Sequence, residues 1–148
     1  MKIRTDFVTN SSSSSFCTIT VETKDGKEYE GLYETGDVQF ADYDPIGLKE
    51  KFLKNISSVS EVLEKMTAWM LGTVADDFNF TEESIYMSGA IDEMKSLNMA
   101  DVAKITVRSN MVVMDEQFID DETEYNYITG KYRHEEYDEE DEDYEEDE

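Results

Sequence analysis

Carboxylates are the most concentrated reactive groups in this sequence. The last fourteen residues, Glu135 to Glu148, contain twelve Asp or Glu and two tyrosines, Tyr137 and Tyr144. An extended chain advances about 3.4 Å per residue, so these carboxylates recur about every 4 Å. One strand of nucleic acid places a phosphate about every 3.4 Å. The segment therefore predicts a polyanion that mimics a single strand, with two tyrosines able to stack on aromatic or arginine groups of a partner.

A second cluster of carboxylates lies shortly before this segment. The stretch from Asp115 to Glu124 contains six Asp or Glu in ten residues, and we expect an acidic loop that extends the same partner-binding surface. The predicted partner-binding residues of the two segments are Asp115, Glu116, Asp120, Asp121, Glu122, Glu124, Glu135, Glu136, Tyr137, Asp138, Glu139, Glu140, Asp141, Glu142, Asp143, Tyr144, Glu145 and Glu146.

The residue types used in catalysis form no recognisable constellation. His134 is the only histidine, and we expect it to be exposed where the folded part meets the acidic segment. Cys17 is the only cysteine and stands in a predicted strand, where a buried thiol behaves as a small apolar group. Any two of the 37 carboxylates can be drawn as a pair, so such pairs identify no glycosidase-type site. The sequence predicts a protein that is not an enzyme.

Metal and cofactor motifs are also missing from the sequence. A single cysteine allows neither an internal disulfide nor a CxxC zinc motif, and there is no P-loop, dinucleotide fingerprint or HExxH. The stretch from Asp42 to Gly47 begins like a calcium loop, but Leu53 stands at position twelve, where a bidentate glutamate is required. Asp44 and Pro45 fit better as the start of a helix. We expect no metal and no cofactor.

The charge of the chain restricts its partners. The net charge is −24, and all thirteen Lys and Arg precede residue 135, so residues 1–134 alone carry 13 − 25 = −12. Such a body repels nucleic acid and attracts basic protein surfaces, including those of proteins that hold nucleic acid. The sequence has no secretory signal and no apolar run long enough to span a bilayer. We expect a cytoplasmic protein without a membrane partner.

The N-terminal string Phe7-Val-Thr-Asn-Ser-Ser-Ser-Ser-Ser-Phe16 resembles a segment found at the N-termini of uncharacterised proteins from gut-type Firmicutes and their mobile elements. The resemblance covers about sixteen residues. It implies a bacterial or phage-like origin, and it implies no reaction, cofactor or site residue. From the residues themselves, the serines predict a flexible loop between strands, and an anion-binding nest is the alternative.

Hydrophobic periodicity predicts the elements that carry these groups. Alternation predicts strands, and Asp25-Gly26 predicts a hairpin with a type I′ turn, which needs positive φ at both positions. Ser58 and Glu61 form a capping box before the best amphipathic stripe in the chain. The predicted strands span residues 2–8, 16–22, 28–34, 104–114 and 125–132, the last with a turn or bulge at 129–131, and the predicted helices span 45–54, 59–74 and 81–97.

This order of elements predicts an α+β fold. We expect an antiparallel sheet built from the N- and C-terminal strands, with two or three helices packed on one face. Residues 1–134 form the single predicted domain, and residues 135–148 form a disordered acidic tail.

The function most consistent with these features is inhibition by mimicry. The acidic residues would occupy the basic groove of a nucleic-acid-binding protein or nuclease complex, as an anti-CRISPR-like anti-defence protein of a phage or mobile element would. Two alternatives remain open. The body could be a non-catalytic interaction module whose tail serves solubility or tethering, or the tail could loosely buffer divalent cations.

Overall fold

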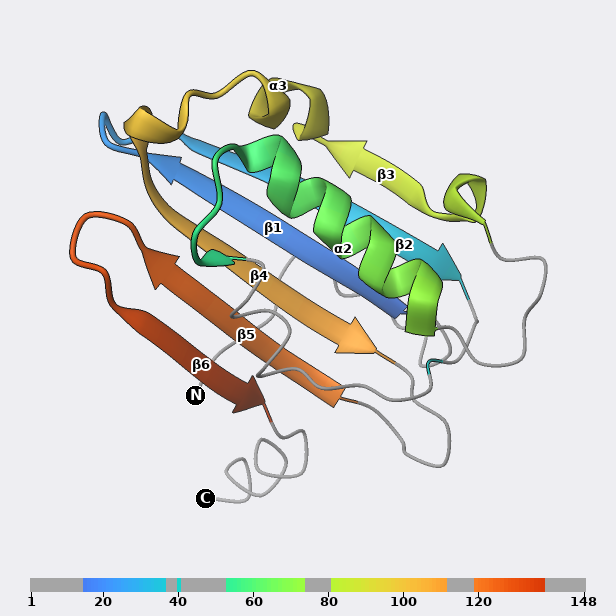
Figure 1. Ribbon diagram of the computed structural model, residues 1–148. Coiled ribbons are helices and arrows are strands. Elements are labelled where there is room, and N and C mark those ends of the chain that lie inside the picture. The colour runs from blue at the N-terminus through green and yellow to red at the C-terminus, as the bar shows by residue number, and fades with distance from the viewer. Residues whose placement is uncertain (1–14, 37–39, 41–52, 74–80, 112–118, 138–148) are drawn as a thin grey trace, which may run out of the picture.

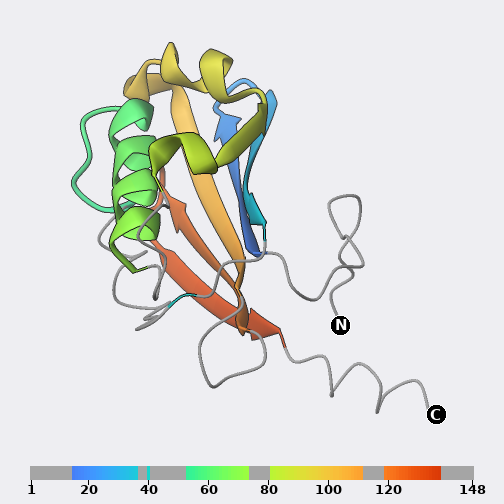
Figure 2. The same ribbon diagram turned by 90° about the vertical axis from the view of Figure 1, so that its right-hand side faces the viewer.

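A single antiparallel sheet of six strands dominates the computed structural model (Figure 1). The structure describes residues 15–36, 40, 53–73, 81–111 and 119–137. The spatial order of the strands is β3-β2-β1-β4-β5-β6, and helix α2 lies across one face of the sheet (Figure 2). The strands are β1 (Ser15–Thr23), β2 (Glu28–Gly36), β3 (Tyr86–Gly89), β4 (Val102–Met111), β5 (Ile119–Asn126) and β6 (Tyr132–Tyr137).

The predicted α+β class and antiparallel sheet are confirmed, but there is less helix than predicted. Among the described residues, α2 (Val59–Thr73) is the only helix of several turns, and α3 (Ile91–Lys95) has five residues. Two 3₁₀ turns, η1 (Glu82–Ser84) and η2 (Met99–Asp101), are also described. The strand predicted at 2–8, Ser11 to Ser14 and most of the helix predicted at 45–54 lie outside the described residues.

The β1–β2 hairpin forms where the sequence predicts it, with a different turn. Gly26 has φ of +91°, and Asp25 does not have positive φ, so the turn is not type I′. The N–H of Gly26 donates to the carbonyl of Thr23 at 3.0 Å, and the N–H of Thr23 donates to the carbonyl of Lys27 at 2.9 Å. A turn that places one glycine at positive φ before rejoining the ladder fits these bonds.

Helix α2 begins at the predicted capping residues. The N–H of Glu61 donates to the hydroxyl of Ser58 at 3.2 Å, and the Glu61 carboxylate accepts from the N–H of Ser57 at 2.9 Å. The apolar stripe of the helix then packs on β1 and β4. The core cluster includes Val59, Val62, Leu63, Met66, Met70, Ile19, Val21, Ile105 and Val107.

The helix predicted over residues 81–97 is wrong. The segment divides into η1, β3 and α3, because Gly89 has φ of +86° and its backbone lies against that of Glu30. Ile91 and Met94 keep their helical spacing and are buried, whereas Met87 is exposed on the edge strand β3. Asn98, predicted as a C-terminal cap, instead begins η2 and accepts from the N–H of Ala100.

The acidic loop predicted at 115–124 is wrong from Ile119 onward, because these residues form β5. The single strand predicted at 125–132 is divided: Tyr125 and Asn126 end β5, Tyr132 begins β6, and a turn lies between them, where one was predicted at 129–131. The chain turns there around Gly130, which has φ of +75°, and separates β5 from β6. β6 runs to Tyr137, so Glu135, Glu136 and Tyr137 belong to a strand. Asp115, Glu116 and residues 138–148 lie outside the described residues.

Gly31 lies where β2 packs closely against α3. A Cβ atom at this position would collide with Cδ1 of Ile91 and lie 3.3 Å from Cε of Met94. We expect Gly31→Ala to lower the free energy of unfolding by about 1 to 3 kcal/mol, because the buried side chains of Ile91 and Met94 would have to shift to admit the methyl group. Urea denaturation measures this. Gly72→Ala is the control: a Cβ there meets nothing within 4 Å, and we expect a gain of about 0.5 to 1 kcal/mol from helix propensity.

Candidate partner-binding surface

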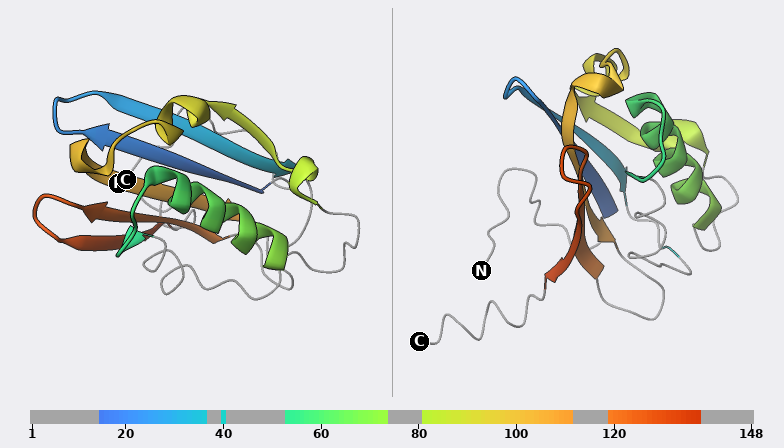
Figure 3. Two further views of the ribbon diagram at one scale, coloured as in Figure 1. Left: turned by 45° about the horizontal axis from the view of Figure 1, so that its top comes forward. Right: turned by 60° about the vertical axis from the view of Figure 1, so that its left-hand side comes forward.

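The register of the strands assigns the side chains of the sheet to two faces, because residues paired across antiparallel strands point to the same side. One face packs against α2 (Figure 3). A row across this face consists of Gly31, Ile19, Val107, Thr123 and His134. It is apolar over its centre and becomes polar only at β5 and β6.

The opposite face carries most of the charge of the sheet, and we name it the acidic sheet face. Its carboxylates are Glu22, Glu28, Glu30, Glu34, Asp120, Glu122, Glu124 and Glu135, and its cations are Lys104, Arg108 and Arg133. Eight carboxylates less three cations leave a net charge of −5. No helix within the described part of the chain lies on this side (Figures 2 and 3).

One end of the acidic sheet face, at the start of β1 and the ends of β2 and β4, is buried. Phe16 and Leu32 are buried there and lie outside the main core cluster. The exposed carboxylates stand towards the margins. Glu28 and Glu30 are exposed on β2, and Glu122 and Glu135 are half-buried on β5 and β6. A basic partner would therefore contact these four glutamates of β2, β5 and β6 before the buried carboxylates.

Asp120 and Asp121, both predicted to bind a partner, are instead buried within the sheet. Asp120 lies on the acidic sheet face and accepts two bonds from Arg108, from Nε and Nη2, each at 3.1 Å. Asp121 lies on the helix-covered face, with its carboxylate 2.9 Å from Nε2 of His134. Both carboxylates are held by cationic or imidazole groups of neighbouring strands, and their visible role is structural.

Glu124, also on this face, contacts two cations. It pairs with Arg133, and its other oxygen lies 3.6 Å from Nζ of Lys104. Burial raises the pKa of Glu124, but Arg133 and Lys104 outweigh it, so the pKa lies below its usual value. Glu135 also pairs with Arg133, at 2.7 Å. The two glutamates therefore share one guanidinium, and the carboxyl of Glu124 remains ionised to lower pH.

His134 is not the exposed residue that the sequence predicts. It sits in β6 opposite Thr123, and its side chain is only 13% exposed. Cys17 is fully buried, as predicted, and its Sγ lies 3.3 Å from the Ser109 hydroxyl. Cys17, Ser109 and Asp121 occupy one row of the helix-covered face. All three are closed to solvent, so this row offers no exposed nucleophile and base.

Comparisons with protein-family models, with curated proteins and with solved structures gave no match. Among the described residues, no cluster of three or more His, Cys, Asp or Glu is arranged to hold a metal ion. None of the described helices combines the length and the apolar character needed to cross a membrane.

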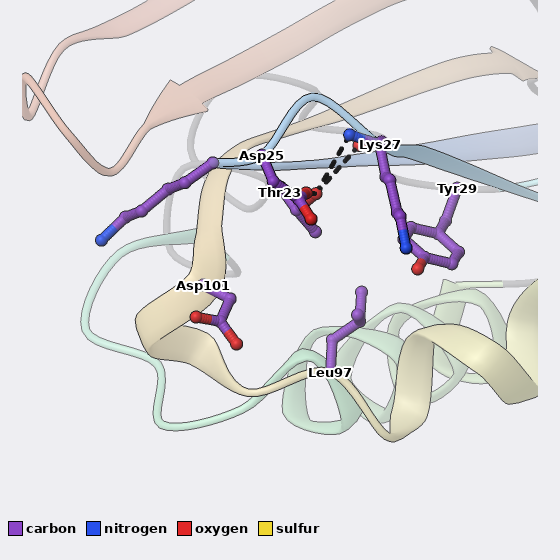
Figure 4. A pocket seen from close by; sticks show the side chains of 7 residues that line it. Thr23, Asp25, Lys27, Tyr29, Leu97 and Asp101 are labelled. Atoms are coloured by element: carbon purple, nitrogen blue, oxygen red, sulfur yellow. Dashed lines mark hydrogen bonds between the residues drawn. The ribbon is translucent and has the colours of Figure 1, made fainter.

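A cavity of about 290 Å³ lies beside the β1–β2 turn (Figure 4). Leu97 and Asp101, from the segment after α3, face Lys27 and Tyr29 across it. The hydroxyl of Thr23 donates to the carboxylate of Asp25, and this bond lowers the pKa of Asp25. Two lysines and two aspartates line the cavity. These charges balance, so the lining selects no single class of ligand.

Proposed function

We propose that this protein binds the basic groove of a nucleic-acid-binding protein and competes with nucleic acid for it. The observation that carries the proposal is the acidic sheet face, which has a net charge of −5 before any contribution from residues 138–148. Complementary charge speeds encounter and selects basic partners.

The regular spacing of side chains on the sheet also supports this proposal. Alternate residues of one strand stand about 6.8 Å apart on one face, and neighbouring strands lie about 4.8 Å apart. Glu122 and Glu135 are paired across β5 and β6, and Glu28 and Glu30 stand on the same face, in β2. A fixed array of this kind loses little entropy when it binds, unlike a free polyanionic chain. The sheet supplies a fixed array of carboxylates for the contact, and residues 138–148 add negative charge.

The favoured partner is a nuclease with a positively charged nucleic-acid channel, including an RNA-guided effector. Anti-defence activity in a phage or mobile element is the biological setting in which such an inhibitor would act. The second candidate is an interaction module without inhibitory activity, whose acidic residues provide solubility or tether a basic protein.

Competition binding tests the proposal. A labelled single-stranded DNA or RNA is bound to a candidate nuclease, and this protein is added at low and at high salt. We expect displacement of the nucleic acid at low salt and much weaker displacement at about 0.5 M salt, where the screening length is only a few ångströms. Displacement that does not depend on salt would contradict a charge-driven mechanism.

Charge-matched variants separate the acidic sheet face from net charge alone. The face variant is Glu28→Gln/Glu30→Gln/Glu122→Gln, and the control is Glu82→Gln/Glu83→Gln/Glu93→Gln, whose side chains are exposed on η1 and α3. At about 0.5 kcal/mol for each exposed charge pair, we expect the face variant to lose about tenfold in affinity and the control much less. Equal losses would favour the interaction-module alternative.

A further inference from the structure

β6 is the last strand of the sheet, and its outer edge is open within the described part of the chain. The N–H of Asn126 donates to the carbonyl of Lys131 at 2.9 Å, and the N–H of Tyr127 donates to the carbonyl of Ala103 at 2.8 Å. Even-numbered residues of β5 therefore bond towards β6, and odd-numbered residues bond towards β4. In an antiparallel ladder this alternation continues along the strand.

The alternation determines which groups of β6 face outward. Arg133 pairs with Glu124 and Glu135 pairs with Glu122, so the backbone groups of these two β6 residues bond to β5. His134 and Glu136 direct their N–H and C=O groups to the outer edge. An edge strand of this kind is a template for another strand.

The charges of β6 are ordered along the strand. Lys131 directly precedes the strand and Arg133 stands near its start, whereas Glu135 and Glu136 stand towards its end. An antiparallel second copy of β6 places the cationic end of each strand against the anionic end of the other. Charged edges usually prevent pairing, but this order makes the edge complementary to itself.

Two copies of β6 can pair in only a few registers that both form the backbone hydrogen bonds and keep side chains on matching faces of the sheet. Outward-facing residues must pair with each other, and paired side chains must lie on the same face. With His134 on the two-fold axis, Arg133 stands opposite Glu135 of the second copy in a non-hydrogen-bonded pair, where side chains are closest. A shift of this axis to Glu135 would place two glutamates opposite each other. The register centred on His134 is therefore favoured.

We propose that two copies of this chain associate through their β6 edges in this register. The two six-stranded sheets then form one continuous sheet, and each Arg133 meets a glutamate of the other copy. The net charge of −24 repels the second copy, so salt strengthens the association by screening this repulsion. This salt dependence has the opposite sign to that of the basic-partner binding proposed above, and the inference does not rest on that function.

Analytical ultracentrifugation of the full chain tests the proposal over a range of concentration at low salt and at about 0.5 M salt. We expect the mass to rise from 17.1 kDa towards twice that value as concentration and salt increase. A mass of 17.1 kDa under all these conditions would overturn the proposal.

Charge reversal locates the interface. Arg133→Glu and Glu135→Arg each place like charges opposite one another, and each variant alone is expected to be monomeric. An equal mixture of the two restores every opposite-charge pair between the copies, so we expect a heterodimer. Lys95→Glu, an exposed reversal on α3, is the control and should leave the wild-type mass unchanged. If both single variants remain dimeric, or if the mixture remains monomeric while both variants retain wild-type circular dichroism, the interface is not β6.

Discussion

Replacing His134 with alanine is expected to lower the free energy of unfolding by about 3 kcal/mol or more, because the change removes one member of a buried pair. The Asp121 side chain is fully buried, and its carboxylate lies 2.9 Å from Nε2 of His134. Without the imidazole, this carboxylate keeps its desolvation cost and loses a charged or hydrogen-bonding partner. Urea denaturation followed by the fluorescence of Trp69, which is packed in the core, measures the change.

A second variant separates the loss of the pair from the cost of leaving a buried charge. Asp121→Asn/His134→Gln keeps two polar groups able to bond and removes the buried charge, so we expect this double variant to be more stable than His134→Ala. If His134→Ala costs under about 1 kcal/mol, as for an exposed ion pair, then the pair does not stabilise the sheet as the burial of Asp121 implies.

The pairing of His134 with Asp121 could not be predicted from the sequence, because it depends on register. The two residues are thirteen positions apart, and they meet only because the chain turns around Gly130. The sequence shows His134 beside a run of acids, and this context predicts an exposed side chain. Likewise, the density of charge in 115–124 predicts a loop, because nothing local reveals that Arg108 and His134 will pair with Asp120 and Asp121.

Local signals gave better predictions where one residue type determines the geometry. Asp25-Gly26 placed the first hairpin correctly, since a glycine at positive φ is needed there. The Ser58–Glu61 capping box placed the start of α2. The spacing of Met87, Ile91 and Met94 fitted a longer helix, but Gly89 takes a positive φ that a helix does not allow. In that segment tertiary contact with β2 outweighed the helical period.

Replacing Arg108 with alanine is expected to cost about 3 to 5 kcal/mol of unfolding free energy, because it leaves the buried carboxylate of Asp120 without its guanidinium. The pair is bidentate, with both N–O distances at 3.1 Å, and the Asp120 side chain is only 4% exposed. Bidentate geometry of this kind adds strength and orientation to the contact. Chemical denaturation at neutral pH measures the loss.

Arg133→Ala is the matched control, since it removes the same side chain from the same face of the sheet. The Arg133 side chain is 43% exposed, and its partners Glu124 and Glu135 are partly open to solvent, so we expect a loss of about 1 kcal/mol or less. The contrast would separate carboxylates that stabilise the fold from those available to a partner. If the two substitutions cost the same, the buried pair of Arg108 with Asp120 stabilises the fold no more than an exposed pair does. If Arg108→Ala costs far more, Asp120 stabilises the fold and is separate from the carboxylates proposed to meet a partner, Glu28, Glu30, Glu122 and Glu135.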